Sequence, residues 1–314
     1  MLRNVVTRIV FIWIALMIVA ALLGDVTLAA SDAGRTAADF LEIGQGARAA
    51  GLGGAYTAVS EGAVAAYWNP AGMAGLENFE VSLGHFAWYQ DITVEQMSLA
   101  VPLKSGPVLG ASITYVNYGT IDGYDALGNP TGDLTAYDLS GGVSLGLALH
   151  DRWSAGVTAK IVNQRLDEYN ASAFAADFGL KYHAETFAVA ATVTNLGSNM
   201  TFDESSEKLP SAFHVGAAVF PFSGIMTTSL DVEKKFQGDV IIRQGLEFGF
   251  DERYYVRTGY DYLPAQNSRD LAAGLSVGAG LRYGFADIDY SFTPNDKSTS
   301  EDLHRFTLVL RLTR

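Results

Sequence analysis

Hydrophobic and polar residues alternate with a period of two from Phe79 to the end of the chain. Within residues 153–164, for example, Val157 and Ile161 fall on one face and Lys160 falls on the other. Such alternation is typical of β-strands, because successive side chains of a strand point to opposite faces of a sheet. The pattern therefore predicts an all-β structure over this part of the chain.

About fourteen segments follow the pattern, and most are about 10–15 residues long. A tilted strand needs about 9–11 residues to cross a bilayer, whereas strands of soluble proteins usually have about 5–6. The segments lie near 79–90, 94–103, 107–118, 136–150, 153–169, 172–184, 186–196, 211–222, 225–236, 239–251, 253–263, 269–284, 285–294 and 302–313. Their lengths predict strands that cross a membrane.

The connections between the segments differ at the two ends of the predicted sheet. Residues 120–135 and 197–211 form long polar loops by sequence, whereas 150–152, 183–185 and 251–253 form tight turns. Short turns at one end and long loops at the other are characteristic of outer-membrane barrels. We therefore expect a transmembrane antiparallel β-barrel of about fourteen strands, with its apolar face toward lipid and its polar face toward the lumen.

The beginning of the chain predicts export. Arg3 and Arg8 precede an apolar run from Ile9 to Leu23, and the small-residue stretch TLAAS follows, with residues 27–29 as the cleavage signal. A basic start, an apolar run and a small-residue exit together form a secretory signal peptide. The alternative is a transmembrane anchor, but the run is shorter than the ~20 residues that a spanning helix needs. We expect cleavage of this peptide and a final location in the outer membrane of a bacterial cell.

The charge balance argues against a nucleic-acid partner. The 314 residues include 21 Lys and Arg against 34 Asp and Glu, which gives a net charge of −13. A phosphate backbone requires clustered basic residues. The chain has no Cys, and its five His are scattered, so we expect no cofactor, no bound metal and no enzymatic activity. A Ser, His and Asp that meet only in space, as in a barrel lipase, are the alternative.

Residues 40–77 precede the first predicted strand and are rich in Gly and Ala, with little charge. A barrel of about fourteen strands is too wide for its own side chains to fill, because about eight strands is the filling size. A Gly-rich backbone can pack closely against a wall, and Asn69-Pro70 suits a tight turn. We predict that this segment plugs the lumen, with a disordered linker as the alternative.

The predicted organisation has three parts. A signal peptide covers 1–29, an N-terminal hatch covers 30–78, and the outer-membrane barrel covers 79–314.

The hatch sequence carries a family resemblance. Residues 40–76, FLEIGQGARAAGLGGAYTAVSEGAVAAYWNPAGMAGL, resemble the N-terminal signature of the PorV/PorQ family of outer-membrane proteins. That family is related in fold to the FadL long-chain fatty-acid transporters. The later stretches SAGVTAK and HRFTLVLRL are also similar. The resemblance implies a FadL-like barrel whose hatch holds the Asn-Pro-Ala element. Arg314 departs from the pattern, because such barrels usually end on an aromatic residue.

Two sets of residues are candidates for function. The hatch and gate set consists of Arg48, Gly51, Gly53, Gly54, Tyr67, Trp68, Asn69, Pro70 and Ala71. The luminal charges on the last six strands are Asp231, Glu233, Arg243, Glu247, Arg257, Asp261, Arg282, Asp287, Asp289 and Arg311. Charges cannot stay unpaired in a dry interior, so we predict cross-strand ion pairs or a wet lumen. We interpret these charges as structural and not as a selectivity device.

Three functions are compatible with this sequence. The first is a FadL-like conduit or binding site for hydrophobic molecules such as fatty acids, surrounded by outer-membrane lipid. The second, implied by the resemblance, is an accessory of the type IX secretion system that binds secretion proteins or cargo through its outer loops. The third is a purely structural surface protein. The sequence does not decide between them.

Overall fold

The computed structural model describes residues 36–89, 91–104, 106–202, 205–222, 225–263, 274–294 and 302–312. The predicted signal peptide and Arg314 lie outside the described residues.

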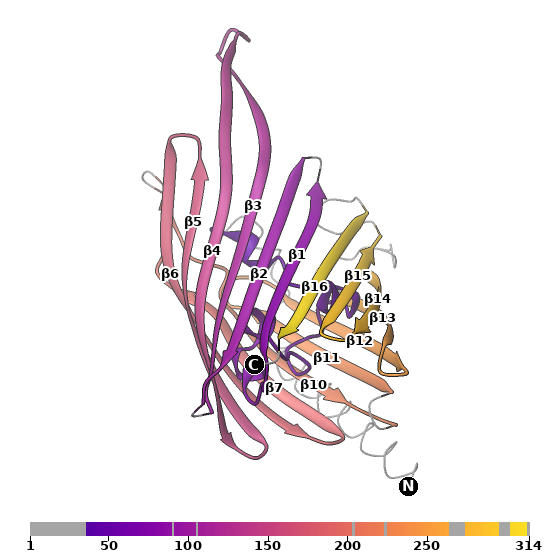
Figure 1. Cartoon of the computed structure of the whole chain (residues 1–314). Helices are drawn as coiled ribbons and strands as arrows, with labels where there is room; N and C mark the ends of the chain where they lie inside the picture. The colour runs from indigo at the N-terminus through magenta and orange to yellow at the C-terminus, as the bar shows by residue number, and fades with distance from the viewer. Residues whose placement is uncertain are drawn as a thin grey trace.

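Fourteen of the described strands close into one antiparallel barrel (Figure 1). They are β1 (Phe79–Tyr89), β2 (Ile92–Pro102), β3 (Val108–Tyr124), β4 (Pro130–His150), β5 (Trp153–Leu166), β6 (Tyr169–Ala184), β7 (Phe187–Gly197), β10 (Ala212–Val219), β11 (Met226–Lys235), β12 (Val240–Phe250), β13 (Tyr254–Tyr262), β14 (Leu275–Tyr283), β15 (Ala286–Thr293) and β16 (Leu303–Leu312). Neighbours in sequence are neighbours in the sheet, and β1 pairs with β16 to close it. The predicted fold class is confirmed.

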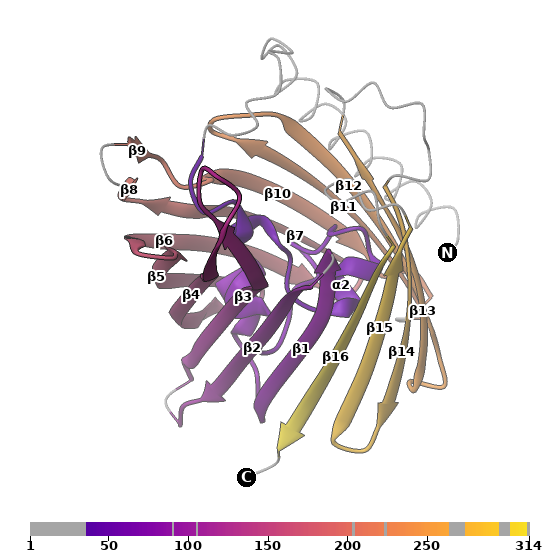
Figure 2. The same ribbon diagram turned by 90° about the horizontal axis from the view of Figure 1, so that it is seen from above.

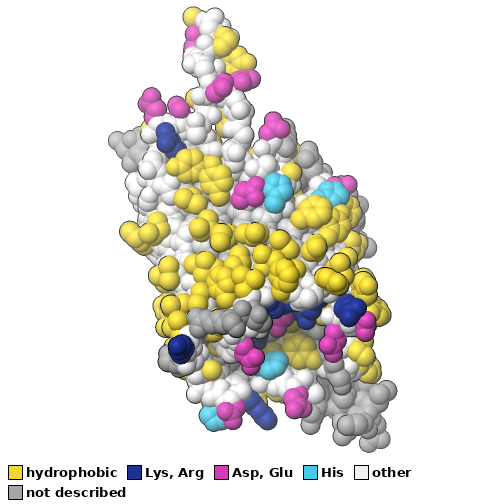
Figure 3. All heavy atoms as spheres, viewed as in Figure 1, with side chains coloured by type: hydrophobic (Ala, Val, Ile, Leu, Met, Phe, Trp, Pro, Cys, Tyr) yellow, Lys and Arg dark blue, Asp and Glu magenta, His cyan; other side chains and the backbone are white. Residues whose placement is uncertain are grey.

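The alternation of residue types determines which side chains face outward. In β5, Val157 and Ile161 are exposed on the outer surface, whereas Thr158 and Lys160 are buried on the luminal side. Figure 3 shows the result as a band of hydrophobic side chains across the outer face, with most acidic side chains above or below it. A barrel in a bilayer needs such an apolar band. Among the described residues, no helix has the length and hydrophobicity that would take it across a membrane.

The long loop predicted over 120–135 is wrong as a loop, because β3 and β4 continue through it. Their ladder reaches Tyr124 opposite Pro130, so the two strands form an arm that projects beyond the barrel (Figure 1). Asp125 closes the turn at the tip, since its Oδ1 accepts from the backbone N–H groups of Leu127 and Asn129, both at 2.8 Å. The side chain of Leu127 is left 87% exposed.

The predicted loop at 197–211 also contains regular structure. Two short strands, β8 (Met200–Phe202) and β9 (Ser205–Glu207), pair there as a separate hairpin. Together with the arm, this hairpin marks what we call the long-loop end of the barrel. The opposite end, where β1 begins and β16 finishes, is the short-turn end.

Residues 36–78, here called the luminal segment, lie inside the barrel (Figure 2). The segment contains η1 (Asp39–Glu42), α2 (Ala47–Gly51), α3 (Ala65–Trp68) and η2 (Pro70–Met73). It starts at the long-loop end, where Thr36 forms a β-bridge with Lys208. It finishes at the short-turn end, where it leads into β1. The luminal segment therefore runs from one end of the barrel to the other.

Candidate functional site

The Asn-Pro-Ala element forms the start of η2. The Asn69 side chain is fully buried, and its Oδ1 accepts from the backbone N–H of Ala71 at 3.1 Å, which caps the helix. Its Nδ2 donates to the carbonyl of Thr57 at 3.1 Å. Pro70 occupies the first helical position, where its missing N–H is not needed. One amide side chain therefore both starts η2 and ties it to an earlier turn of the luminal segment.

Glycines of the barrel wall make room for this element. A Cβ atom on Gly156 of β5 would collide with the Pro70 backbone, and one on Gly179 of β6 would collide with the Asn69 side chain. η2 accordingly packs against β4, β5 and β6. The sequence analysis missed these wall residues, although glycines recur on the polar faces of the predicted strands.

Substitution of Asn69 by aspartate should destabilise the closed arrangement. Aspartate keeps the acceptor for the Ala71 N–H but loses the donor to the Thr57 carbonyl and buries a carboxylate. We expect the free energy of unfolding to fall by about 1–3 kcal/mol, measured by denaturant unfolding of the purified barrel. Asn117→Asp is the matched control, because Asn117 is exposed and uses only its Oδ1, on the Gly119 N–H. Equal stability of the two variants would contradict the assigned role of Asn69.

Two aromatic side chains tie α3 to the beginning of the luminal segment. The Tyr67 hydroxyl lies 2.8 Å from the carbonyl oxygen of Leu41 and 2.9 Å from that of Ile43, and it donates to this pair. Burial raises the pKa of the Tyr67 phenol above its usual range, so the hydroxyl keeps its proton. The Trp68 Nε1 donates to the carbonyl of Gln45 at 2.8 Å.

Arg48 connects α2 to the barrel wall beside it. Its Nε and Nη2 donate to the two carboxylate oxygens of Glu247 at 3.0 and 2.9 Å, a bidentate pair. Glu247 also accepts from Arg257 at 2.6 Å, and Arg257 donates to Asp289 at 2.6 Å. Arg48 reaches Glu61 within the luminal segment at 2.5 Å, but that carboxylate side chain is 63% exposed. Three strands and α2 are thus joined by one buried chain of charges.

The remaining luminal charges of the sequence analysis also have partners. The ion pairs are Arg243–Glu233 at 2.5 Å, Arg243–Asp261 at 3.3 Å, Arg282–Asp287 at 3.2 Å and Arg311–Asp287 at 2.6 Å. Asp231 is different, since it accepts the backbone N–H of Thr57 at 2.7 Å. Apart from Asp231, these opposite charges on adjacent strands therefore compensate each other along the luminal face of the wall.

The predicted hatch glycines follow α2 along the wall. Gly53 has φ +63° and Gly54 has φ +78°, a left-handed conformation that favours glycine. Gly51 faces Gly278 of β14, and a Cβ on Gly51 would lie 3.2 Å from the Gly278 Cα. Small residues on both sides let α2 and its following turn touch the wall directly.

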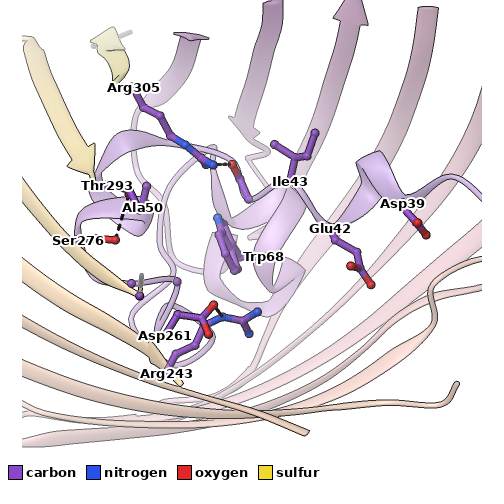
Figure 4. A pocket seen from close by; sticks show the side chains of 14 residues that line it. Asp39, Glu42, Ile43, Ala50, Trp68, Arg243, Asp261, Ser276, Thr293 and Arg305 are labelled. Atoms are coloured by element: carbon purple, nitrogen blue, oxygen red, sulfur yellow. Dashed lines mark hydrogen bonds and ion pairs between the residues drawn. The ribbon is translucent and has the colours of Figure 1, made fainter. Parts of the chain in front are cut away.

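Several cavities remain beside the luminal segment, and one of about 150 Å³ is lined among others by Tyr67, Lys160 and Glu233. The long-loop cavity, of about 300 Å³, is lined among others by Ile43, Trp68, Arg243, Asp261 and Arg305 (Figure 4). In Figure 4 the Trp68 ring lies between Arg305, whose Nη1 donates to the Gly44 carbonyl at 2.9 Å, and the Arg243–Asp261 pair. This cavity offers an aromatic surface and charged groups in one space.

The short-turn cavity, of about 480 Å³, lies at the other end of the lumen. Its lining includes Arg48, Tyr56, Leu76, Arg282 and Arg311. The guanidinium of Arg282 lies over the Tyr255 ring at 5.3 Å, a cation–π arrangement.

The candidate residues are thus divided between three places. Gly53, Gly54, Trp68, Arg243 and Asp261 line the long-loop cavity. The short-turn cavity collects Arg48, Arg257, Arg282, Asp287, Asp289 and Arg311. Asn69, Pro70 and Ala71 line neither cavity and are buried against the other side of the wall. Over the ranges that the structure describes, no three His, Asp or Glu residues come together as a metal site.

Comparisons with known proteins agree with this architecture. The model of a family described as "Uncharacterised protein family (UPF0164)" matches residues 18–304. A search of curated proteins finds no match.

Solved structures share the fold at low sequence identity. The toluene transporter TbuX of Ralstonia pickettii is 15% identical, with a TM-score of 0.60 over 86% of this chain and 98% of that chain. The toluene transporter TodX of Pseudomonas putida is 13% identical, with a TM-score of 0.59 over 85% and 97%. A FadL homologue of Pseudomonas aeruginosa is 12% identical, with a TM-score of 0.54 over 84% and 97%. At these identities the likeness shows a common fold.

Proposed function

The chain belongs to the family UPF0164, and from that premise and its FadL-like fold we propose that it binds or passes hydrophobic molecules across the bacterial outer membrane, without enzymatic activity. The observation that carries the proposal is a lumen filled by the chain's own luminal segment that still keeps a cavity at each end. A purely structural barrel has no need of such cavities. We further propose that residues 30–78 act as a hatch, released from its signal peptide after residue 29.

The exterior supports the location. In a closed barrel every strand is hydrogen-bonded to a neighbour on both sides, and the apolar band on the outer face suits contact with acyl chains. The solved barrels of this fold include two described as toluene transporters. In the long-loop cavity, Ile43 and Trp68 offer an apolar surface, while Arg243, Arg305 and the carboxylates of Asp39, Glu42 and Asp261 offer polar groups. This combination favours a hydrophobic molecule with a polar end, such as a fatty acid.

Binding can be tested with a brominated fatty acid, because bromine quenches tryptophan fluorescence only at short range. The barrel, reconstituted in lipid nanodiscs, should show a saturable quenching component from Trp68, in addition to the non-saturable quenching that follows from partition into lipid. Trp68→Phe should lose the saturable component. Trp153→Phe is the matched control and should keep it, because Trp153 lies on the outer wall against Tyr182, with ring centroids 5.0 Å apart. The absence of any saturable component in the unmodified protein would refute the proposal.

A second candidate function is favoured by the arm. The PorV/PorQ resemblance suggests an accessory of type IX secretion, and the arm presents Tyr124 at 61% and Leu127 at 87% exposure beyond the barrel. Large exposed apolar residues often mark protein contacts. Co-purification of secretion proteins or cargo with the full-length chain, lost in a Tyr124→Ser/Leu127→Ser variant, would favour this candidate over the first.

A further inference from the structure

The two cavities lie along the same part of the barrel wall. The long-loop cavity includes Asp261 of β13, Ser276 of β14, Thr293 of β15 and Arg305 of β16. The short-turn cavity is bounded by other residues of the same four strands: Tyr255, Arg257, Leu281, Arg282, Asp287, Asp289, Thr307, Val309 and Arg311. Both cavities therefore follow β13 to β16, one above the other along the barrel axis.

The region of α2 stands between them. Ala50 lines the long-loop cavity, while Arg48 and Ala49 line the short-turn cavity. α2 packs against β13, β14, β15 and β16, the strands that the two cavities share. A single helical turn with its flanking residues thus lies between the two cavities.

Backbone makes part of the contact between α2 and the wall. Gly51 meets Gly278 of β14, and the backbone at Gly53 meets Gly259 of β13. Ala49 of α2 and the adjoining Leu52 add apolar contact, because both are buried in a hydrophobic cluster that includes Ala188 of β7 and Ala218 of β10. η2 is held by the fully buried Met73 side chain and by the hydrogen bonds of the Asn69 amide.

An ion pair also connects α2 to the wall. The bidentate Arg48–Glu247 pair is the strongest polar connection between α2 and the wall, and the Glu247 side chain is only 6% exposed. Loss of Arg48 leaves Glu247 paired with Arg257, so no wall charge is left without a partner. The barrel itself should tolerate this loss, while α2 loses its main connection.

We infer that the passage through this barrel follows the β13–β16 wall, that α2 is its gate, and that Arg48 is the positioning residue that keeps the gate closed. The Asn-Pro-Ala element is the fixed anchor on the other side of the lumen, and it does not move during opening. The inference rests on the proposed function for its purpose, but its geometry can be tested without any hydrophobic ligand.

The test is ion conductance through single barrels in planar lipid bilayers. Arg48→Gln should raise the open fraction by about tenfold or more, since a buried ion pair is lost and each factor of ten needs only about 1.4 kcal/mol. Gly278→Ala should act in the same direction without any change of charge, because its Cβ would lie 3.2 Å from the Gly51 Cα and would push α2 away from the wall.

Two controls match these variants. Glu95→Gln removes a charge from the outer surface, where Glu95 pairs with His85 at 2.7 Å. Gly141→Ala adds a methyl group at a strand glycine that has no atom within 4 Å of the new Cβ. Both should conduct as the unmodified barrel does. Folding of every variant is checked by its shift in electrophoretic mobility on heating.

The inference is overturned if folded Arg48→Gln and Gly278→Ala barrels both stay closed, or if Asn69→Asp opens the barrel as much as they do. If fatty acid gives no saturable quenching but the variants conduct as expected, the proposed ligand is refuted and the gate is supported.

Discussion

Replacement of Gly259 by valine is expected to drive the luminal segment away from the barrel wall. The Cβ of any residue at this position of β13 would overlap the backbone of Leu52 and Gly53. A backbone cannot change its rotamer to escape, so the turn after α2 has to leave its position. Overpacking usually costs about 1–3 kcal/mol even when flexible side chains can adjust, and we expect at least that cost here.

Trypsin cleavage after Arg48 measures this displacement. In the closed barrel Arg48 lies within α2, and its side chain is bound to Glu247 of the wall. The unmodified protein should therefore resist cleavage there. The Gly259→Val barrel should be cut readily, and mass spectrometry identifies the site. Gly141→Val is the control, because position 141 is open on the outer side. Equal resistance of the two variants to trypsin would show that Gly259 is not needed for the luminal segment to pack against the wall.

The second large effect concerns the lipid-facing wall. Val143 of β4 is 65% exposed on the outer surface and pairs with Ala159 of β5 in the ladder. Arginine at this position would place a charge within the apolar band, at a cost of about 2–4 kcal/mol for a site near the bilayer midplane. We expect the free energy of folding into lipid vesicles, measured by urea titration, to become less favourable by this amount.

Leu127→Arg is the comparison for this prediction. Leu127 is more exposed than Val143 but lies at the tip of the arm, outside the barrel. Its replacement should change stability by less than about 0.5 kcal/mol, as is usual for surface sites. Similar costs at the two positions would mean that the band around Val143 does not face lipid.

Much of the barrel was predictable from sequence because a membrane wall repeats one simple rule. Each crossing strand must show lipid an apolar face, and residues such as Val157 and Ile161 mark that face at every second position. All fourteen predicted strands are present, most with ends that differ by one to three residues.

The alternation of apolar and polar residues does not identify strands that lie outside the bilayer. Residues 120–135 form strands without an apolar face, because both faces of the arm meet water, and so their sequence resembles a loop. The pairing there depends on the Asp125 turn at the tip. Such a turn is a local hydrogen-bond arrangement that hydrophobic periodicity does not report.

The sequence also did not predict which parts of the luminal segment lie beside the cavities. The resemblance drew attention to Asn69 and Pro70 as gate residues, and the structure places them on the wall opposite both cavities. What distinguishes the two sides of the luminal segment is the set of partners, such as Gly179 for Asn69 and Glu247 for Arg48. These partners are more than 100 residues away, and only closure of the barrel brings them together.

The path of the luminal segment has a consequence for how the barrel is made. The segment starts beside Lys208 at the long-loop end and leads into β1 at the short-turn end. The barrel is sealed only when the last strand, β16, pairs with β1, and β16 also holds the segment through Thr307, which accepts the Ala47 N–H at 2.8 Å. During biogenesis the sheet must therefore close around a luminal segment that is already in position, or the luminal segment must enter the barrel after it has closed.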